Sequence, residues 1–166
     1  MSTFVHIKKI DDLDFGEVEY FSVQDENLES SEFERFLENH MDLKEVETEF
    51  GDLMAWLERL GEDGAEERYF RLERLAQALP PNLKLLELKH EKQLRLCCLR
   101  LSDRAVFLFN GGIKTTKKAQ DCKNVSQYFH SAQQFCRRIQ ELITGNEIYI
   151  DAETQLLTIQ SEGFYL

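Results

Sequence analysis

Two apolar runs separated by only three residues place the strongest constraint on what this chain can fold into. Residues 94–101 (LRLCCLRL) and 105–109 (AVFLF) each have the length and apolar content of a strand, and residues 102–104 (SDR) are typical of a tight turn. A connection this short cannot cross over to a parallel neighbour, so the two strands must pair antiparallel. The centre of the chain is therefore predicted to form an antiparallel sheet.

The flanking sequence predicts one more strand before these two, and a loop and a helix after them. Residues 82–89 (NLKLLELK) predict a preceding strand, joined to the next one by the polar turn 90–93. The lysine-rich segment 110–118 is predicted to be a loop. A helix is expected over about 125–144, because apolar side chains recur there on one side and a glycine follows.

Three helices are predicted before the sheet. Ser31 and Glu34 have the spacing of a capping box, in which the serine accepts a backbone N–H and the glutamate reaches back. The next helix, beginning near Asp42, has a single apolar stripe and is expected to end at Gly61. A third helix is expected over about 65–79, ended by the two prolines that follow.

Period-two alternation predicts a hairpin at each end of the chain, from residues 4–10 with 17–23 and from residues 147–150 with 155–160. The predicted fold class is α+β: helices followed by an antiparallel sheet, with a C-terminal helix and extra terminal hairpins.

The length of 166 residues suits a single domain, 1–166. Within it we expect an acidic hairpin and helical extension over 1–64, a core over 65–145 and a C-terminal hairpin over 146–166.

Charge is segregated along the chain. The net charge is −11 at pH 7, yet residues 1–66 contribute −15, residues 67–146 contribute +8 and residues 147–166 contribute −4. A basic centre suits a phosphate backbone, so the overall acidity does not exclude nucleic acid. The alternative is that the acidic and basic faces simply pair with each other.

Neither a membrane span nor a metal site is apparent in the sequence. No run approaches the ~20 apolar residues of a span, and the N-terminus becomes charged before the apolar part of a signal peptide could form. A cytoplasmic location without membrane partners is therefore expected. The four cysteines lack metal-ligand spacing and are expected to be small core residues in a reducing compartment: Cys97, Cys98, Cys122 and Cys136.

The order of these elements resembles that of the RelE/HigB toxins, a family of ribonucleases. Residues 85–89 (LLELK) look like the family's LyELR strand, and residues 93–96 (QLRL) look like its yRv strand. Residues 107–118 (FLFNGGIKTTKK) look like its LLHGFxKKTxKTP strand and loop. The resemblance covers roughly residues 65–143 and implies a RelE-like core, to which the termini add a longer variant's extensions.

This resemblance implies a toxin of a toxin–antitoxin system that cleaves messenger RNA without a metal or other cofactor. Its expected partners are a cognate antitoxin, messenger RNA and the ribosome. In such cleavage a 2′-hydroxyl attacks the adjacent phosphate, and cations stabilise the phosphorane. The resemblance assigns catalytic roles to Arg95, Lys114 and Lys118. The candidate RNA-binding residues are Lys89, Arg100, Lys117, Tyr128 and His130.

Geometry sets one condition on these candidates. Side chains alternate along a strand, so Arg95 and Arg100 are expected on opposite faces unless a bulge intervenes. We expect Arg95, Lys114, Lys118 and Lys89 to form one concave basic patch, with an acidic surface over residues 25–66.

Three positions depart from the family pattern. Asn110 stands at a loop histidine, Gly112 at an aromatic residue and Thr115 at the second lysine of a pair. No complete acid–base pair is visible, so two further hypotheses stand beside the endoribonuclease. One is a catalytically degenerate relative that acts by protein–protein contact, with an acidic arm that binds a basic partner or shields its own basic sheet. The other is a gyrase-directed toxin of the related ParE branch.

Overall fold

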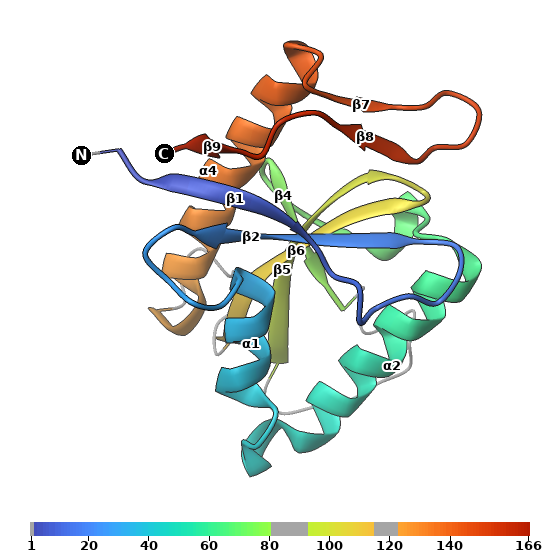
Figure 1. Cartoon of the computed structure of the whole chain (residues 1–166). Coiled ribbons are helices and arrows are strands. Elements are labelled where there is room, and N and C mark those ends of the chain that lie inside the picture. Colours follow the sequence, from blue (N-terminus) through green and yellow to red (C-terminus); the bar gives the residue numbers. More distant parts are fainter. Residues whose placement is uncertain (1, 81–92, 115–122) are drawn as a thin grey trace.

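A seven-stranded sheet forms the middle layer of the molecule (Figure 1). The computed structural model describes residues 2–80, 93–114 and 123–166. In spatial order the strands are β3 (Arg71–Glu73), β4 (Ala76–Leu79), β5 (Gln93–Ser102), β6 (Ala105–Lys114), β2 (Glu19–Asp25), β1 (Phe4–Lys9) and β9 (Gly163–Tyr165). All neighbours pair antiparallel except β2 and β6, which are parallel. The expected α+β class is confirmed.

Helices cover both faces of this sheet. One face carries α1 (Glu32–His40) and α2 (Glu47–Asp63), and the other carries α4 (Lys123–Thr144) with the hairpin of β7 (Ile148–Ile150) and β8 (Leu157–Ile159). Short 3₁₀ turns lie at Lys44–Val46 and Glu67–Tyr69. Two apolar cores result, one on each face, because the strands alternate their side chains between the layers.

Several elements agree with the sequence predictions. The Ser31 hydroxyl accepts from the Glu34 amide at 3.2 Å, and the Glu34 carboxylate accepts from the Ser31 amide at 3.1 Å. Both terminal hairpins form, and β5 and β6 pair antiparallel. Cys97 and Cys98 enter opposite cores, as alternation along a strand requires.

The helix expected over 65–79 is wrong, because β3, β4 and the turn between them occupy residues 71–79. The two strands form a hairpin whose turn includes Arg74, at φ +66°, a backbone conformation that ends a helix. Leu72, which a helix would have buried, is 77% exposed on β3. The local preference for helix is overridden by β4, which completes the hydrogen-bond ladder of β5.

The first strand of the central meander is therefore β4, earlier in the chain than the sequence predicted. The strand expected over 82–89 lies outside the described residues. Within the described residues, β4, β5 and β6 are nevertheless antiparallel neighbours in chain order, and α4 comes after them.

The prediction that Gly61 ends α2 was also wrong, because this glycine lies inside the helix and serves close packing. The expected end of α2 at Gly61 is passed, and the helix ends at the Gly64 cap, where φ is +110°. A Cβ at Gly61 would lie 2.5 Å from the Phe15 ring. Gly61 therefore lets the loop between β1 and β2 pack against α2.

The loop expected over 110–118 is absent from residues 110–114, because β6 continues to Lys114, and residues 115–118 lie outside the described part of the chain. A register shift lies between the pairs Leu96–Gly111 and Cys98–Leu108, so β6 carries one extra residue. A Cβ at Gly111 would lie 1.8 Å from the Arg95 carbonyl oxygen. The two glycines after Asn110 therefore belong to a tightly paired strand, which sequence alone made look like a turn.

The N-terminal hairpin and the C-terminal strand β9 are part of the main sheet, whereas β7 and β8 form a separate two-stranded sheet. β2 pairs with β6, and β9 pairs with the outer side of β1. The segments 1–64, 65–145 and 146–166 thus all contribute strands to one sheet.

Gly111→Ala is expected to lower the free energy of unfolding by about 2–3 kcal/mol, because β5 and β6 must move apart locally. Gly51→Ala is the control, since its Cβ meets nothing within 4 Å on an exposed face of α2. It should raise stability by about 0.5–1 kcal/mol through helix propensity. Urea unfolding measures both, and equal midpoints for Gly111→Ala and the wild type would contradict the close pairing.

Candidate functional site

Arg95 and Lys114 lie on the same face of β5 and β6. Arg95 is opposite Gly112 and Lys114 is opposite Gln93, which makes the two cations diagonal neighbours across the strands. It is the face that α4 covers, since Cys97, two residues along β5, enters the core beneath that helix. Two of the predicted catalytic residues are therefore brought together.

Both cations are buried. Arg95 is 1% exposed and Lys114 is 8% exposed. Desolvation by burial, and then the nearby Arg71 cation, lower the pKa of Arg95 to about 10. The guanidinium thus stays charged at neutral pH while its Nη1 donates to the Leu94 carbonyl at 3.4 Å. Two members of the concave basic patch expected here, Arg95 and Lys114, are thus buried, and the other two, Lys89 and Lys118, lie outside the described residues.

Asn110, which the resemblance aligned with a loop histidine, is a structural group in this protein. Its Oδ1 accepts from the Gly111 amide at 2.8 Å, beside the register shift in β6. Its Nδ2 donates to the Glu32 carboxylate at 3.4 Å. Burial raises the pKa of Glu32, and the bond from Asn110 partly offsets that effect. Asn110 therefore connects β6 to the start of α1.

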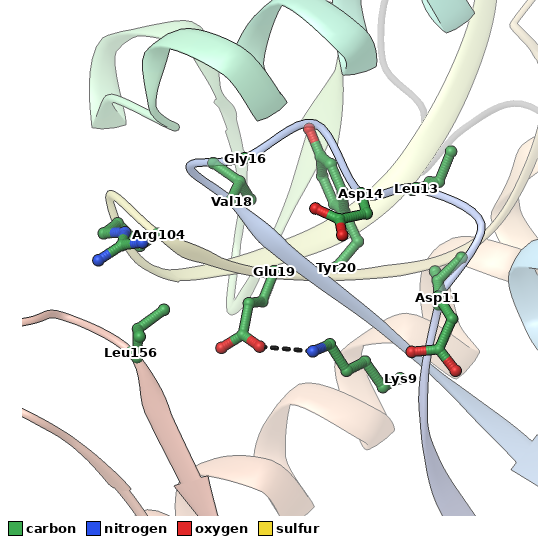
Figure 2. Close-up of a pocket in the computed structure, with 11 residues that line it drawn as sticks. Lys9, Asp11, Leu13, Asp14, Gly16, Val18, Glu19, Tyr20, Arg104 and Leu156 are labelled. Carbon is green, nitrogen blue, oxygen red and sulfur yellow. Dashed lines mark ion pairs between the residues drawn. The ribbon is translucent and has the colours of Figure 1, made fainter.

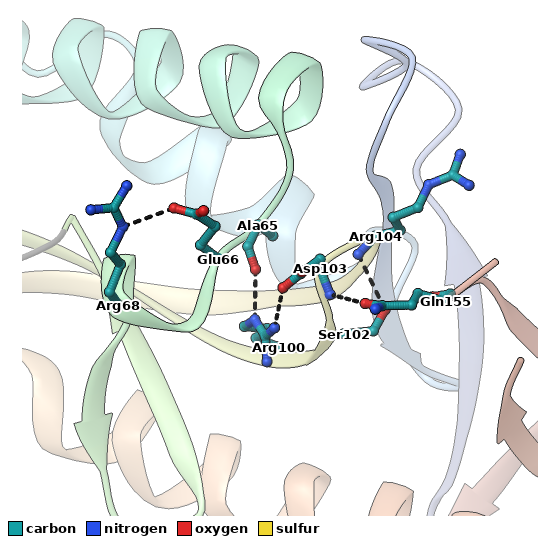
Figure 3. A network of polar contacts seen from close by, with 8 residues as sticks. All are labelled: Ala65, Glu66, Arg68, Arg100, Ser102, Asp103, Arg104 and Gln155. Atoms are coloured by element: carbon teal, nitrogen blue, oxygen red, sulfur yellow. Dashed lines mark hydrogen bonds and ion pairs between the residues drawn. The ribbon is translucent and has the colours of Figure 1, made fainter. Parts of the chain in front are cut away.

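Arg100 lies on the other face of β5 and holds parts of the fold together (Figure 3). Its Nε donates to the Ala65 carbonyl at 2.6 Å, and its Nη2 pairs with Asp103. Arg100 and Arg95 thus face opposite layers, as strand alternation predicted. The guanidinium of Arg100 stabilises the junction between α2 and the β5–β6 turn.

The remaining RNA-binding candidates divide into two groups. On α4, Tyr128 is half-buried and His130 is exposed, on either side of the buried Phe129. Lys89, Lys117 and Lys118 lie outside the described residues.

Sequence reasoning missed Gln133, which joins α4 to the β3–β4 hairpin. Its Oε1 accepts from the amides of Leu75 at 2.8 Å and Ala76 at 3.1 Å, and its Nε2 donates to the Glu73 carbonyl. The sequence signal for this role was a glutamine on the apolar side of the predicted helix. Such a side chain is buried, and its amide then needs hydrogen-bond partners.

Two cavities flank the loop between β1 and β2, and sequence reasoning missed these as well. One, of about 270 Å³, lies between the loop and β2 and reaches Arg104 and Leu156 (Figure 2). The other, of about 330 Å³, lies between the loop and α1. At the first cavity Lys9 and Glu19 form an ion pair at 2.7 Å. The hydrogen bond to Glu19 raises the pKa of Lys9.

The acidic surface expected over residues 25–66 is present. Eleven exposed carboxylates lie in this segment, against the two exposed cations Lys44 and Arg59. The exposed carboxylates are Glu26, Glu29, Glu34, Glu38, Asp42, Glu45, Glu47, Glu58, Glu62, Asp63 and Glu66.

The cysteines in the described part of the chain are buried and unreactive. Burial raises the pKa of Cys97 to about 12 and raises those of Cys98 and Cys136 further. Thiols held neutral in this way are poor nucleophiles and poor metal ligands. Among residues 2–80, 93–114 and 123–166, no group of three or more His, Cys, Asp or Glu side chains could hold a metal ion. No helix in the same residues is long and apolar enough to cross a membrane.

Comparisons of the chain with models of protein families, with curated proteins and with solved structures gave no match.

Arg100→Ala is expected to lower the free energy of unfolding by about 2–3 kcal/mol, because the buried Ala65 carbonyl and Asp103 both lose their donor. Arg100→Lys should recover only part of this loss, since one ammonium cannot reproduce the planar fork. His130→Ala serves as the control on an exposed site and should change stability by less than about 0.5 kcal/mol. If Arg100→Ala unfolds like His130→Ala in urea, the structural role of Arg100 is refuted.

Proposed function

We propose that this protein acts by contact with another protein, on a scaffold whose order of elements resembles the RelE/HigB toxins. One observation carries the proposal: the described cations that the resemblance assigns to RNA are enclosed, while the carboxylates of residues 25–66 face solvent. Arg95 and Lys114 are buried on one face of β5 and β6, and Arg100 is bonded to Ala65 and Asp103 on the other. A phosphorane gains stabilisation only from groups that touch it.

Electrostatics supports the same proposal. An outer surface with eleven exposed carboxylates repels a phosphate backbone and attracts a basic protein surface. Complementary charge of this kind mainly raises the rate of encounter and selects the partner. The acidic surface is thus suited to recognition of a basic partner.

An endoribonuclease is the second candidate, favoured by a separate observation. Arg95 and Lys114 are diagonal neighbours on one face, which is the arrangement that two phosphate-binding cations require. Both side chains are buried, so RNA could reach them only if the residues that cover them moved. The cognate antitoxin, messenger RNA and ribosome stay with this candidate as its proposed partners.

Incubation of the purified protein with messenger RNA in the absence of metal separates the two functions. The proposed contact function predicts uncut RNA, and it predicts that expression of the wild type alone does not slow growth. Cleavage leaving 2′,3′-cyclic phosphate ends would instead establish the endoribonuclease. In that case Arg95→Ala, if still folded in a thermal melt, should lose about a hundredfold in rate, and Arg95→Lys should recover only part of it.

Cross-linking in cell extract provides the positive readout. A carbodiimide joins carboxylates directly to lysine amines, so the contact function predicts protein adducts through residues 25–66. Ultraviolet irradiation should give no RNA adduct above the level of an unrelated acidic protein. RNA adducts without protein adducts would reverse the assignment.

A further inference from the structure

A groove with an apolar floor and an acidic rim lies between the β1–β2 loop and α1. Its cavity of about 330 Å³ is bounded by the end of β1, by loop residues 10–13 and by one side of α1. We call this feature the loop–α1 groove and define its floor by Ile10, Leu13, Phe33 and Leu37.

The floor offers a place for an apolar side chain. Phe33 is 1% exposed, while Ile10, Leu13 and Leu37 are partly buried and pack against the same core. These three side chains keep part of their surface at the cavity, where a partner's apolar group would remove it from water. Centrally placed apolar pockets of this kind supply most of the energy in protein interfaces.

The rim has an excess of negative charge. Asp11 and Asp12 line the groove and are exposed, and within residues 2–80, 93–114 and 123–166 neither takes part in an ion pair. Lys8 and Lys9 line the groove as well, but Lys9 is paired with Glu19, as Figure 2 shows. The carboxylates of Asp11, Asp12 and Glu34 at the groove thus outnumber the remaining cation, Lys8.

The same chemistry continues along α1. Glu34 and Glu38 are exposed one turn apart, and Leu37 lies between them in the sequence. Met41, which caps the helix one turn beyond Leu37, is 55% exposed. Beyond the groove, the surface of α1 therefore continues with an apolar residue and acidic neighbours, which suits an extended or helical segment.

We propose that the loop–α1 groove binds a basic, amphipathic segment of a partner protein. An apolar side chain of that segment enters the cavity beside Leu13, and its lysines or arginines pair with Asp11, Asp12 and Glu34. The inference rests on the proposed function and names where the contact is made. A nucleic acid does not fit, because its phosphates would meet the same carboxylates.

The size of the groove sets the strength of binding. A cavity of about 330 Å³ admits one or two side chains, whereas a stable interface between folded surfaces buries about 800 Å² on each partner. A short segment held mainly by one anchor and a few rim charges should bind in the micromolar range.

The test uses the full chain, labelled with ¹⁵N, and a short synthetic peptide in which leucines and lysines form an amphipathic helix. Amide chemical shifts should change over residues 10–14 and 33–41, and fluorescence anisotropy should give the Kd. The same peptide with glutamate in place of lysine, and an oligouridylate, should bind at least tenfold more weakly.

Two matched double variants separate the groove from the general acidity of the surface. Asp11→Asn with Asp12→Asn should raise the Kd about tenfold and flatten its dependence on salt. Glu58→Gln with Glu62→Gln removes the same charge from exposed positions on α2 and should change the Kd less than twofold. Leu13→Ser should also raise the Kd about tenfold, with a thermal melt to confirm that the variant is folded.

Three outcomes would overturn the inference: equal weakening by both double variants, shifts confined to other residues, or oligouridylate binding as tightly as the lysine peptide. Failure of the proposed function is a different result, because it would appear as cleaved RNA in the metal-free incubation. Uncut RNA together with amide shift changes outside the groove would be consistent with the proposed protein contact, but it would place the binding site elsewhere on the surface.

Discussion

The turn between β5 and β6 is the constraint on which the rest of the structure depends (Figure 3). The backbone of Asp103 accepts from the Ala65 amide at 2.7 Å, and that of Arg104 accepts from the Glu19 amide at 2.8 Å. The Ser102 hydroxyl donates to the Gln155 carbonyl at 2.6 Å. Three residues thus bind the end of α2, the start of β2 and the β7–β8 turn. Because β2 is held there, it joins β6 in parallel and brings the N-terminal hairpin into the sheet.

The same arrangement decides which charges reach solvent. Among the described residues, Arg95 and Lys114 are buried, and Arg95 is among the largest fully buried side chains. The exposed carboxylates of residues 25–66 lie on α1, α2 and the loops, which form the outside of one layer. The acidic surface over residues 25–66 is the physical basis for preferring a basic protein over RNA as the partner.

Local patterns predicted much of the fold because the interactions that produce them are local. The capping box at Ser31 and the tight turn between β5 and β6 depend on neighbours within a few residues. The segment over 65–79 was misread because its pairing partner, β5, lies about twenty residues away. For the site, strand alternation correctly separated Arg95 from Arg100. Alternation cannot report burial, so it did not predict that Arg95 is enclosed.

The sequence by itself determined the α+β class, the antiparallel β5–β6 pair, the terminal hairpins and the segregation of charge, since each follows from spacing or composition. Only the tertiary structure decided the rest. The role of Gly111 depends on the Arg95 carbonyl of another strand, and the loop–α1 groove depends on Leu13 and Leu37 lining one cavity. Such contacts join residues that are far apart in the sequence, so the periodicity of a helix or strand does not predict them. Their energies come from packing and desolvation, which exist only once the layers have closed.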